Sequence, residues 1–119
     1  MVNQKDKATR TPLYCAVSMG AVKCVELLMS DDRTDPNIKP DYNIFRDAPL
    51  MMAVKCNRAK IVELLIRDKR TEPNIKDDNN YDRYDGYGNT PLMHAIKENL
   101  VDCVKVLFLV RPAPLYHDN

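Results

Sequence analysis

Apolar residues recur along the chain in a pattern that appears three times. In each copy they stand at positions i, i+3 and i+4 after a Thr-Pro or Ala-Pro pair, which is the spacing of a one-sided helix. A second apolar stretch follows in each copy, with charged residues between its apolar ones. The pattern predicts two short helices per copy. The apolar positions of the first helices are Leu13, Ala16 and Val17, then Leu50, Ala53 and Val54, then Leu92, Ala95 and Ile96.

The expected ends of the first helices are marked by residues with special backbone preferences. A proline at the first helical position loses no bonded amide, so Pro12, Pro49 and Pro91 indicate helix starts. Glycine and asparagine tolerate a left-handed backbone, which ends a helix and lets the chain turn back. Residues of this kind stand nine positions after each start of the pattern, at Gly20, Asn57 and Asn99.

The repetition extends beyond the helices, because residues 33–39 read RTDPNIK and residues 70–76 read RTEPNIK. Units that repeat at this spacing cannot bury their apolar faces alone, so they stack on one another. The small residues Ala16, Ala53 and Ala95 indicate close helix contacts in such a stack. We predict one domain composed of a polar lead and first finger (1–10), repeat 1 (11–47), repeat 2 (48–89) and repeat 3 with a C-terminal cap (90–119).

The segments TPLYCAV, APLMMAV and TPLMHAI resemble the opening of ankyrin repeats, and DGYGNTPL resembles the turn that precedes it. The resemblance covers Thr11 to about Phe108. It implies an all-α, ankyrin-like solenoid of about three helix-turn-helix repeats with β-hairpin fingers. Where that family usually has histidine, this chain has Tyr14, Met51 and Met93, so an apolar contact is expected in place of its hydrogen bonds.

The predicted units are longer than those of the family. Thr11 to Ala48 spans 37 residues and Ala48 to Thr90 spans 42, against about 33 for an ankyrin repeat. The excess lies in the loops before the second and third units. Insertions in repeat proteins collect in loops on one face, which is often the binding face. We therefore expect enlarged finger loops that take part in recognition.

The resemblance implies that partners are held by fingertips and by the inner face of the first helices. Carried over position by position, it predicts a partner-binding set of Arg10, Ser18, Met19, Tyr42, Ile44, Phe45, Asp47, Lys55, Cys56, Tyr84, Tyr87, Asn89, Lys97 and Glu98. Tyr42 and Tyr84 occupy equivalent places, as do Phe45 and Tyr87, and exposed rings make good anchors. The alternative is that these rings cover the edges of their own units.

Composition narrows the classes of partner. The chain has 18 basic and 17 acidic side chains and a net charge of +1, too balanced for the field that nucleic-acid or anionic-membrane binding requires. No apolar run has the length of a membrane span, and the polar start lacks the core of a secretory signal. We expect a protein partner, no nucleic acid, no membrane insertion, and a cytoplasmic location with the nucleus as the alternative.

The residues needed for catalysis or metal binding are sparse. Cys24 and Cys103 occupy equivalent places and are interpreted as small core residues, while Cys15 and Cys56 lack zinc-site spacing. The loop from Asp77 to Asp85 is acidic but lacks the glycine and glutamate of an EF-hand. His94 and His117 are the two histidines, and no glycine-rich phosphate loop is present. We predict no enzyme activity and no cofactor or metal.

The last unit ends differently from the others. Leu109 and Val110 stand where earlier copies have Ser30 with Asp31 and Arg67 with Asp68. We expect Pro114, Leu115 and Tyr116 to cover this apolar end in a monomer rather than a homodimer. Another repeat, a partner or a second copy are the alternatives. The predicted function is an adaptor, scaffold or inhibitor, with self-assembly or a calcium-dependent loop as rival readings.

Overall fold

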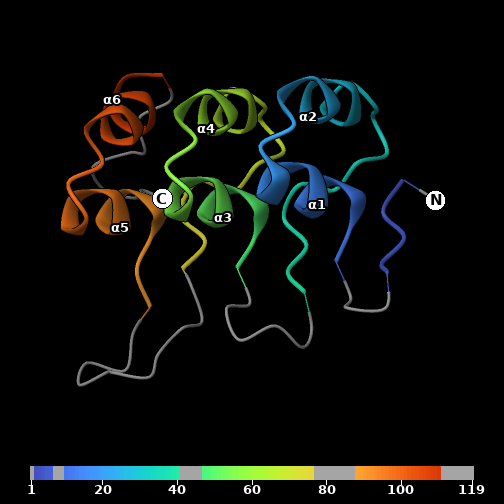
Figure 1. Cartoon of the computed structure of the whole chain (residues 1–119), viewed down its shortest axis with the longest axis horizontal. Coiled ribbons are helices and arrows are strands. Elements are labelled where there is room, and N and C mark those ends of the chain that lie inside the picture. The colour runs from blue at the N-terminus through green and yellow to red at the C-terminus, as the bar shows by residue number, and fades with distance from the viewer. Residues whose placement is uncertain (1, 7–9, 41–46, 77–87, 111–119) are drawn as a thin grey trace.

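The computed structural model describes residues 2–6, 10–40, 47–76 and 88–110, and within them it contains six helices and no strand. The helices form three antiparallel pairs that stand side by side (Figure 1). One row holds the first helix of each pair, and the second row holds the second. The pairs are α1 (Pro12–Met19) with α2 (Val22–Met29), α3 (Pro49–Lys55) with α4 (Ala59–Ile66), and α5 (Pro91–Lys97) with α6 (Val101–Leu109). This arrangement confirms the predicted all-α stack.

The helix ends follow the sequence signals. Proline opens α1, α3 and α5, and the Oγ atoms of Thr11 and Thr90 accept hydrogen bonds from backbone amides in the first turns of α1 and α5. Gly20, Asn57 and Asn99 have φ angles of 72°, 55° and 57°. These left-handed residues end each first helix, as predicted, and let the second helix turn back against it.

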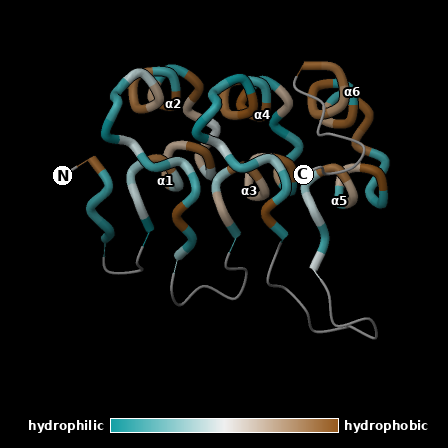
Figure 2. Tube along the Cα trace, turned by 180° about the vertical axis from the view of Figure 1, so that it is seen from behind, coloured by the Kyte–Doolittle hydropathy of each residue, from teal (hydrophilic) through white to brown (hydrophobic). Residues whose placement is uncertain are grey.

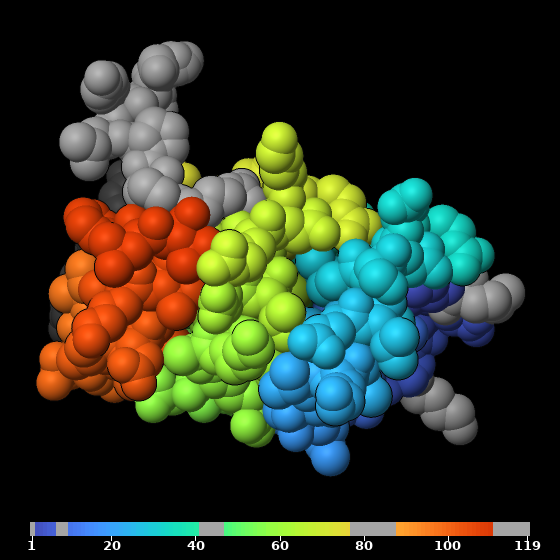
Figure 3. Space-filling model, turned by 90° about the horizontal axis from the view of Figure 1, so that it is seen from above, coloured from blue at the N-terminus to red at the C-terminus, as the bar shows by residue number. Residues whose placement is uncertain are grey.

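The core runs through the stack as one continuous layer between the two rows. Helices of one row pack against the next helix in that row as well as against their own partners. Apolar and hydrophilic stretches alternate along both rows of helices (Figure 2). The three units pack into one body (Figure 3). Ala53 and Ala95 are fully buried and Ala16 nearly so, as close helix contacts require. The middle unit is the best covered, with Leu50, Met51, Ala53, Val54, Ile61, Val62, Leu65 and Ile66 all buried.

The interpretation of Cys24 as a core residue is wrong, because Cys24 is exposed while Cys103 is buried. Their counterpart in the middle unit, Ile61, is also buried. In α4 and α6 this position lies on the side that packs against the preceding unit, whereas no described helix packs on that side of α2. The same holds for Leu27, which is 73% exposed. Burial at this position therefore depends on the place of the unit in the stack and not on the residue type.

Candidate functional site

The last residues of the three first helices form one row across the stack, here called the helix-end row: Ser18 and Met19 on α1, Lys55 and Cys56 at the end of α3, and Lys97 and Glu98 at the end of α5. Met19, Cys56, Lys97 and Glu98 are exposed. Ser18 is half-buried, and its hydroxyl donates to the carbonyl of Cys15 at 3.0 Å. The structure thus brings the predicted helix residues together, with at least one exposed side chain per unit.

Asp47 and Lys55 form an ion pair of 3.1 Å between the carboxylate and Nζ, and Asp47 is fully buried. Lys55 retains only a small exposed fraction. A buried carboxylate is expensive to desolvate unless a cation compensates it, which explains why Lys55 turns toward Asp47. Asp47 has no surface to offer a partner, contrary to the role expected from the sequence. The pair instead fixes the end of the second finger to α3.

The first finger is closed by its own residues. The amide of Asp6 donates to the carbonyl of Arg10 at 2.9 Å, and the Arg10 amide donates back to the Asp6 carboxylate at 2.9 Å. The guanidinium of Arg10 adds an ion pair of 2.8 Å to the same carboxylate. The charge of Arg10 is therefore largely paired with Asp6 in its own finger, although its side chain remains partly exposed.

Two asparagines fasten the finger bases to the turns that follow the second helices. Asn3 donates from its amide to the carbonyl of Arg33 at 2.7 Å and accepts from the amide of Asp35 at 2.9 Å. Asn37 repeats this geometry one unit further along, with the carbonyl of Arg70 at 2.8 Å and the amide of Glu72 at 2.8 Å. Each amide side chain donates one hydrogen bond and accepts another, so it bridges two backbone groups of the following turn. The fingers consequently leave the stack from fixed points.

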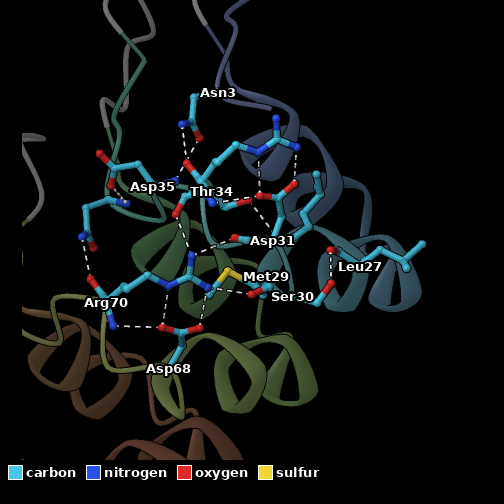
Figure 4. Close-up of polar contacts among 12 residues, drawn as sticks. Asn3, Leu27, Met29, Ser30, Asp31, Thr34, Asp35, Asp68 and Arg70 are labelled. Carbon is cyan, nitrogen blue, oxygen red and sulfur yellow. Dashed lines mark hydrogen bonds and ion pairs between the residues drawn. The ribbon is translucent and has the colours of Figure 1, made fainter. Parts of the chain in front are cut away.

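Arg70 joins the second unit to the first. Its guanidinium is held by Asp68 at 2.7 Å and donates to the carbonyls of Met29, Asp31 and Thr34 at 2.6–2.9 Å (Figure 4). The last carbonyls of a helix lack partners within it, and Arg70 supplies one for α2. Arg70 is thus a cap for the neighbouring unit as well as a member of its own.

Sequence reasoning did not assign roles to Asn3, Asn37 or Arg70. The signal was present, because RTDPNIK and RTEPNIK place arginine and asparagine at the same positions, and Asn3 with Lys5 matches the NIK part of that motif. A polar residue repeated at one position of stacked units indicates a contact repeated between them.

Several predicted site residues lie outside the described residues. These are Tyr42, Ile44, Phe45, Tyr84 and Tyr87, the acidic loop between Asp77 and Asp85, and the expected cap of Pro114, Leu115 and Tyr116. Asn89 is described, and it is half-buried directly before the cap of α5. The aromatic contacts expected from the loops therefore remain predictions.

The chemistry available in the described part of the chain is limited. All four cysteines are free, and burial raises the pKa of the Cys103 thiol, which keeps it protonated. Among these residues, no group of three or more His, Cys, Asp and Glu side chains is placed to hold a metal ion. None of the helices seen there has the length and apolar composition needed to cross a bilayer.

Comparison with known families gives a consistent result. A family model described as ankyrin repeats, in three copies, matches residues 39–113, and a single ankyrin-repeat model matches residues 10–41. Together these matches cover all six helices. No curated protein matches the sequence.

Proposed function

We propose, from the premise that this chain belongs to the ankyrin-repeat family, that it is a recognition module that binds a partner protein through its helix-end row and fingers. Ankyrin repeats are generally protein–protein interaction modules and are typically non-enzymatic. An adaptor, scaffold or inhibitor would use such a surface in the same way.

The observation that carries the proposal is the register of Met19, Cys56 and Glu98. These three exposed residues occupy the same position in successive units, so they form a line across the stack. The line mixes an apolar side chain, a thiol and a carboxylate, with Lys97 beside the last of them. An exposed methionine adapts its shape to a partner, and its burial contributes roughly 1.5–3 kcal/mol.

Rigidity of the supporting structure favours binding by this surface. The Asn3 and Asn37 contacts and the Arg70 cap fix the finger bases before a partner arrives. A surface ordered in advance loses little conformational entropy on association. The enlarged loops that the sequence predicts within residues 40–47 and 77–89 would add fingertip contacts to this surface.

Affinity capture with the intact chain tests the proposal when it is paired with surface variants. The triple variant Met19→Glu, Cys56→Ser and Glu98→Lys should lose a captured protein that the wild type retains. A second variant with both enlarged loops shortened separates the contribution of the fingers. The control is Lys60→Gln with Lys105→Gln, which alters exposed residues on the second helices instead.

Circular dichroism must show the wild-type helix content and melting midpoint for the triple variant and the control, because every side chain that they substitute is exposed. Loss of capture in both the triple variant and the control would contradict recognition through the helix-end row. Retention of the captured protein in the triple variant and in the loop variant would contradict the proposed function as a whole.

A further inference from the structure

Neighbouring units inside the stack pack through two different surfaces. One of these surfaces is exposed at the N-terminal end of the stack, and the other is exposed at the C-terminal end. The N-terminal end face consists of Cys24, Leu27 and Arg33. The C-terminal end face consists of Met93, Ile96 and Phe108. These faces lie at opposite ends of the stack (Figures 1 and 3). Inside the stack, the equivalent positions are the ones through which neighbouring units pack.

The C-terminal end face keeps the apolar chemistry of a buried contact. Ile96 is 59% exposed, whereas its counterparts Val17 and Val54 are completely buried by the following unit. Phe108 is 54% exposed, whereas its counterpart Ile66 is buried. Met93, the third member of this face, is 47% exposed, so all three apolar side chains are suited to contact with a further helix pair.

The N-terminal end face offers the matching apolar residues. Leu27 is 73% exposed, while its counterparts Leu64 and Val106 are partly buried against the hydrophobic core. Cys24 is exposed where Ile61 and Cys103 are buried. The side of α2 that would face a preceding unit is therefore free to receive one.

Arg33 adds a directional polar contact to this face. Asp31 holds its guanidinium at 2.7 Å, in the geometry by which Asp68 holds Arg70. Arg70 also donates to three carbonyls of the preceding unit. Among the described residues, the side chain of Arg33 bonds only to Asp31, and it is 74% exposed. Arg33 thus has the Asp-held geometry of Arg70, and most of its side chain is exposed to solvent.

We propose that these faces bind each other and that copies of this chain associate head to tail. Met93, Ile96 and Phe108 of one copy would pack on Cys24 and Leu27 of the next. Arg33 would donate to the carbonyls of Phe108 and Val110, the counterparts of the Met29 and Asp31 carbonyls that Arg70 binds. The last carbonyls of α6 need such partners. This association is independent of the proposed recognition function.

The contact is heterologous, because two different faces meet, so it leaves a free face at each end of the assembly. Association through it therefore does not stop at a dimer. The interface involves one helix pair on each side and belongs with small, weak contacts. Although the sequence favoured a capped monomer, these exposed faces support growth of the assembly as the concentration rises.

Sedimentation velocity of the intact chain, from about 10 µM to about 1 mM, tests the proposal in the range where small interfaces associate. The weight-average mass should rise by more than about twofold across the series.

Leu27→Glu blocks association through the N-terminal end face, and Ile96→Glu blocks association through the C-terminal end face. Each variant alone should stay monomeric, whereas an equimolar mixture should form a closed one-to-one pair. Arg33→Ala should weaken wild-type association about tenfold.

Lys60→Gln serves as the control. It lowers the net charge by the same amount as Leu27→Glu, Ile96→Glu and Arg33→Ala, but on an exposed side chain of the middle unit. It should associate like the wild type. Dimers of Leu27→Glu alone would show tail-to-tail pairing and overturn the proposal, as would a wild type that stays monomeric throughout. Should Ile96→Glu lose helix content, Phe108→Glu closes the same face.

Discussion

Gly20 and Arg58, from neighbouring units, are in close contact, and a Cβ atom placed on Gly20 would clash with Nη1 of Arg58. The Nη2 atom of Arg58 donates to the carbonyl of Ser18 at 3.3 Å, near the end of α1. Gly20 is therefore needed for two reasons, its left-handed backbone and the space that the guanidinium occupies. Gly20 thus takes part both in the turn between α1 and α2 and in the contact between the first and second units.

The variant Gly20→Ala should lower the free energy of unfolding by about 1–2 kcal/mol, because a left-handed alanine is strained and Arg58 must move. Urea denaturation measures the change. The control is Asn99→Gly, at the equivalent left-handed residue of the third unit, which should alter stability by less than about 0.5 kcal/mol. Equal stability of Gly20→Ala and the wild type would show that the contact is easily relieved.

Replacing Arg70 should be far more harmful than replacing Arg33. Arg70→Ala removes three hydrogen bonds to carbonyls of the first unit. A single hydrogen bond to a charged group contributes about 1.5–3 kcal/mol, so we expect a loss of at least that size. Arg33→Ala removes only an exposed ion pair with Asp31, and solvent-exposed ion pairs add little to stability. Thermal melting of both variants at low protein concentration provides the comparison. A larger loss for Arg33→Ala would contradict the capping role of Arg70.

Ala53 tests the packing between units, since it is fully buried on α3 between α1 and α5. Ala53→Leu should overpack this contact and destabilise the chain by about 1–3 kcal/mol. The melting midpoint should fall accordingly. A midpoint unchanged from that of the wild type would mean that the helices are not in the close register seen here.

The stability of the chain should depend on the ionisation of Asp31. Its hydrogen bonds with Arg33 lower the pKa of this carboxyl from 3.8 to about 2. A lowered folded-state pKa means that the carboxylate stabilises the fold at neutral pH and that this contribution disappears as the pH falls from about 4 toward 2. Asp31→Asn should therefore melt below the wild type at pH 7, and the difference should shrink by pH 3.

Asp32→Asn provides the control, since Asp32 is exposed and makes no hydrogen bond in the described part of the chain. Its melting point should differ little from that of the wild type at either pH. A difference between Asp31→Asn and the wild type that grows on acidification would contradict the sign derived for Asp31.

Thiol labelling of the native chain should separate the cysteines by their place in the stack. Cys24 and Cys56 are exposed and should react first, while Cys103 is buried with a raised pKa and should react only when the stack opens. Mass spectrometry of peptides after brief alkylation reads the order. Early labelling of Cys103 would indicate that α6 detaches readily from α4.

The local features of the fold could be predicted from the sequence. Proline, glycine and asparagine fixed the expected helix ends, and the one-sided apolar pattern indicated which faces pack, because both signals depend on neighbouring residues alone. Cys24 was misinterpreted for the opposite reason. Its environment depends on whether a unit precedes α2, and the residue itself carries no sign of that.

The candidate site was predicted less completely. The helix-end row followed from repeat equivalence, so Met19 and Cys56 are where that alignment places them. The burial of Asp47 could not be predicted from the sequence, because a carboxylate next to a loop is normally exposed. Its burial depends on the ion pair with Lys55. The contacts of Arg70 required knowledge of which carbonyls a neighbouring unit leaves unpaired.

Burial declines sharply from the middle pair of helices to the last. Nine side chains are buried on α3 and α4, against four on α5 and α6. Local opening is easiest where few apolar contacts must be broken, so the final pair should exchange its amide hydrogens well before the others. A partner that binds α5 and α6 would keep this pair from opening. Because this pair opens most easily, such binding would prolong the lifetime of the entire folded chain.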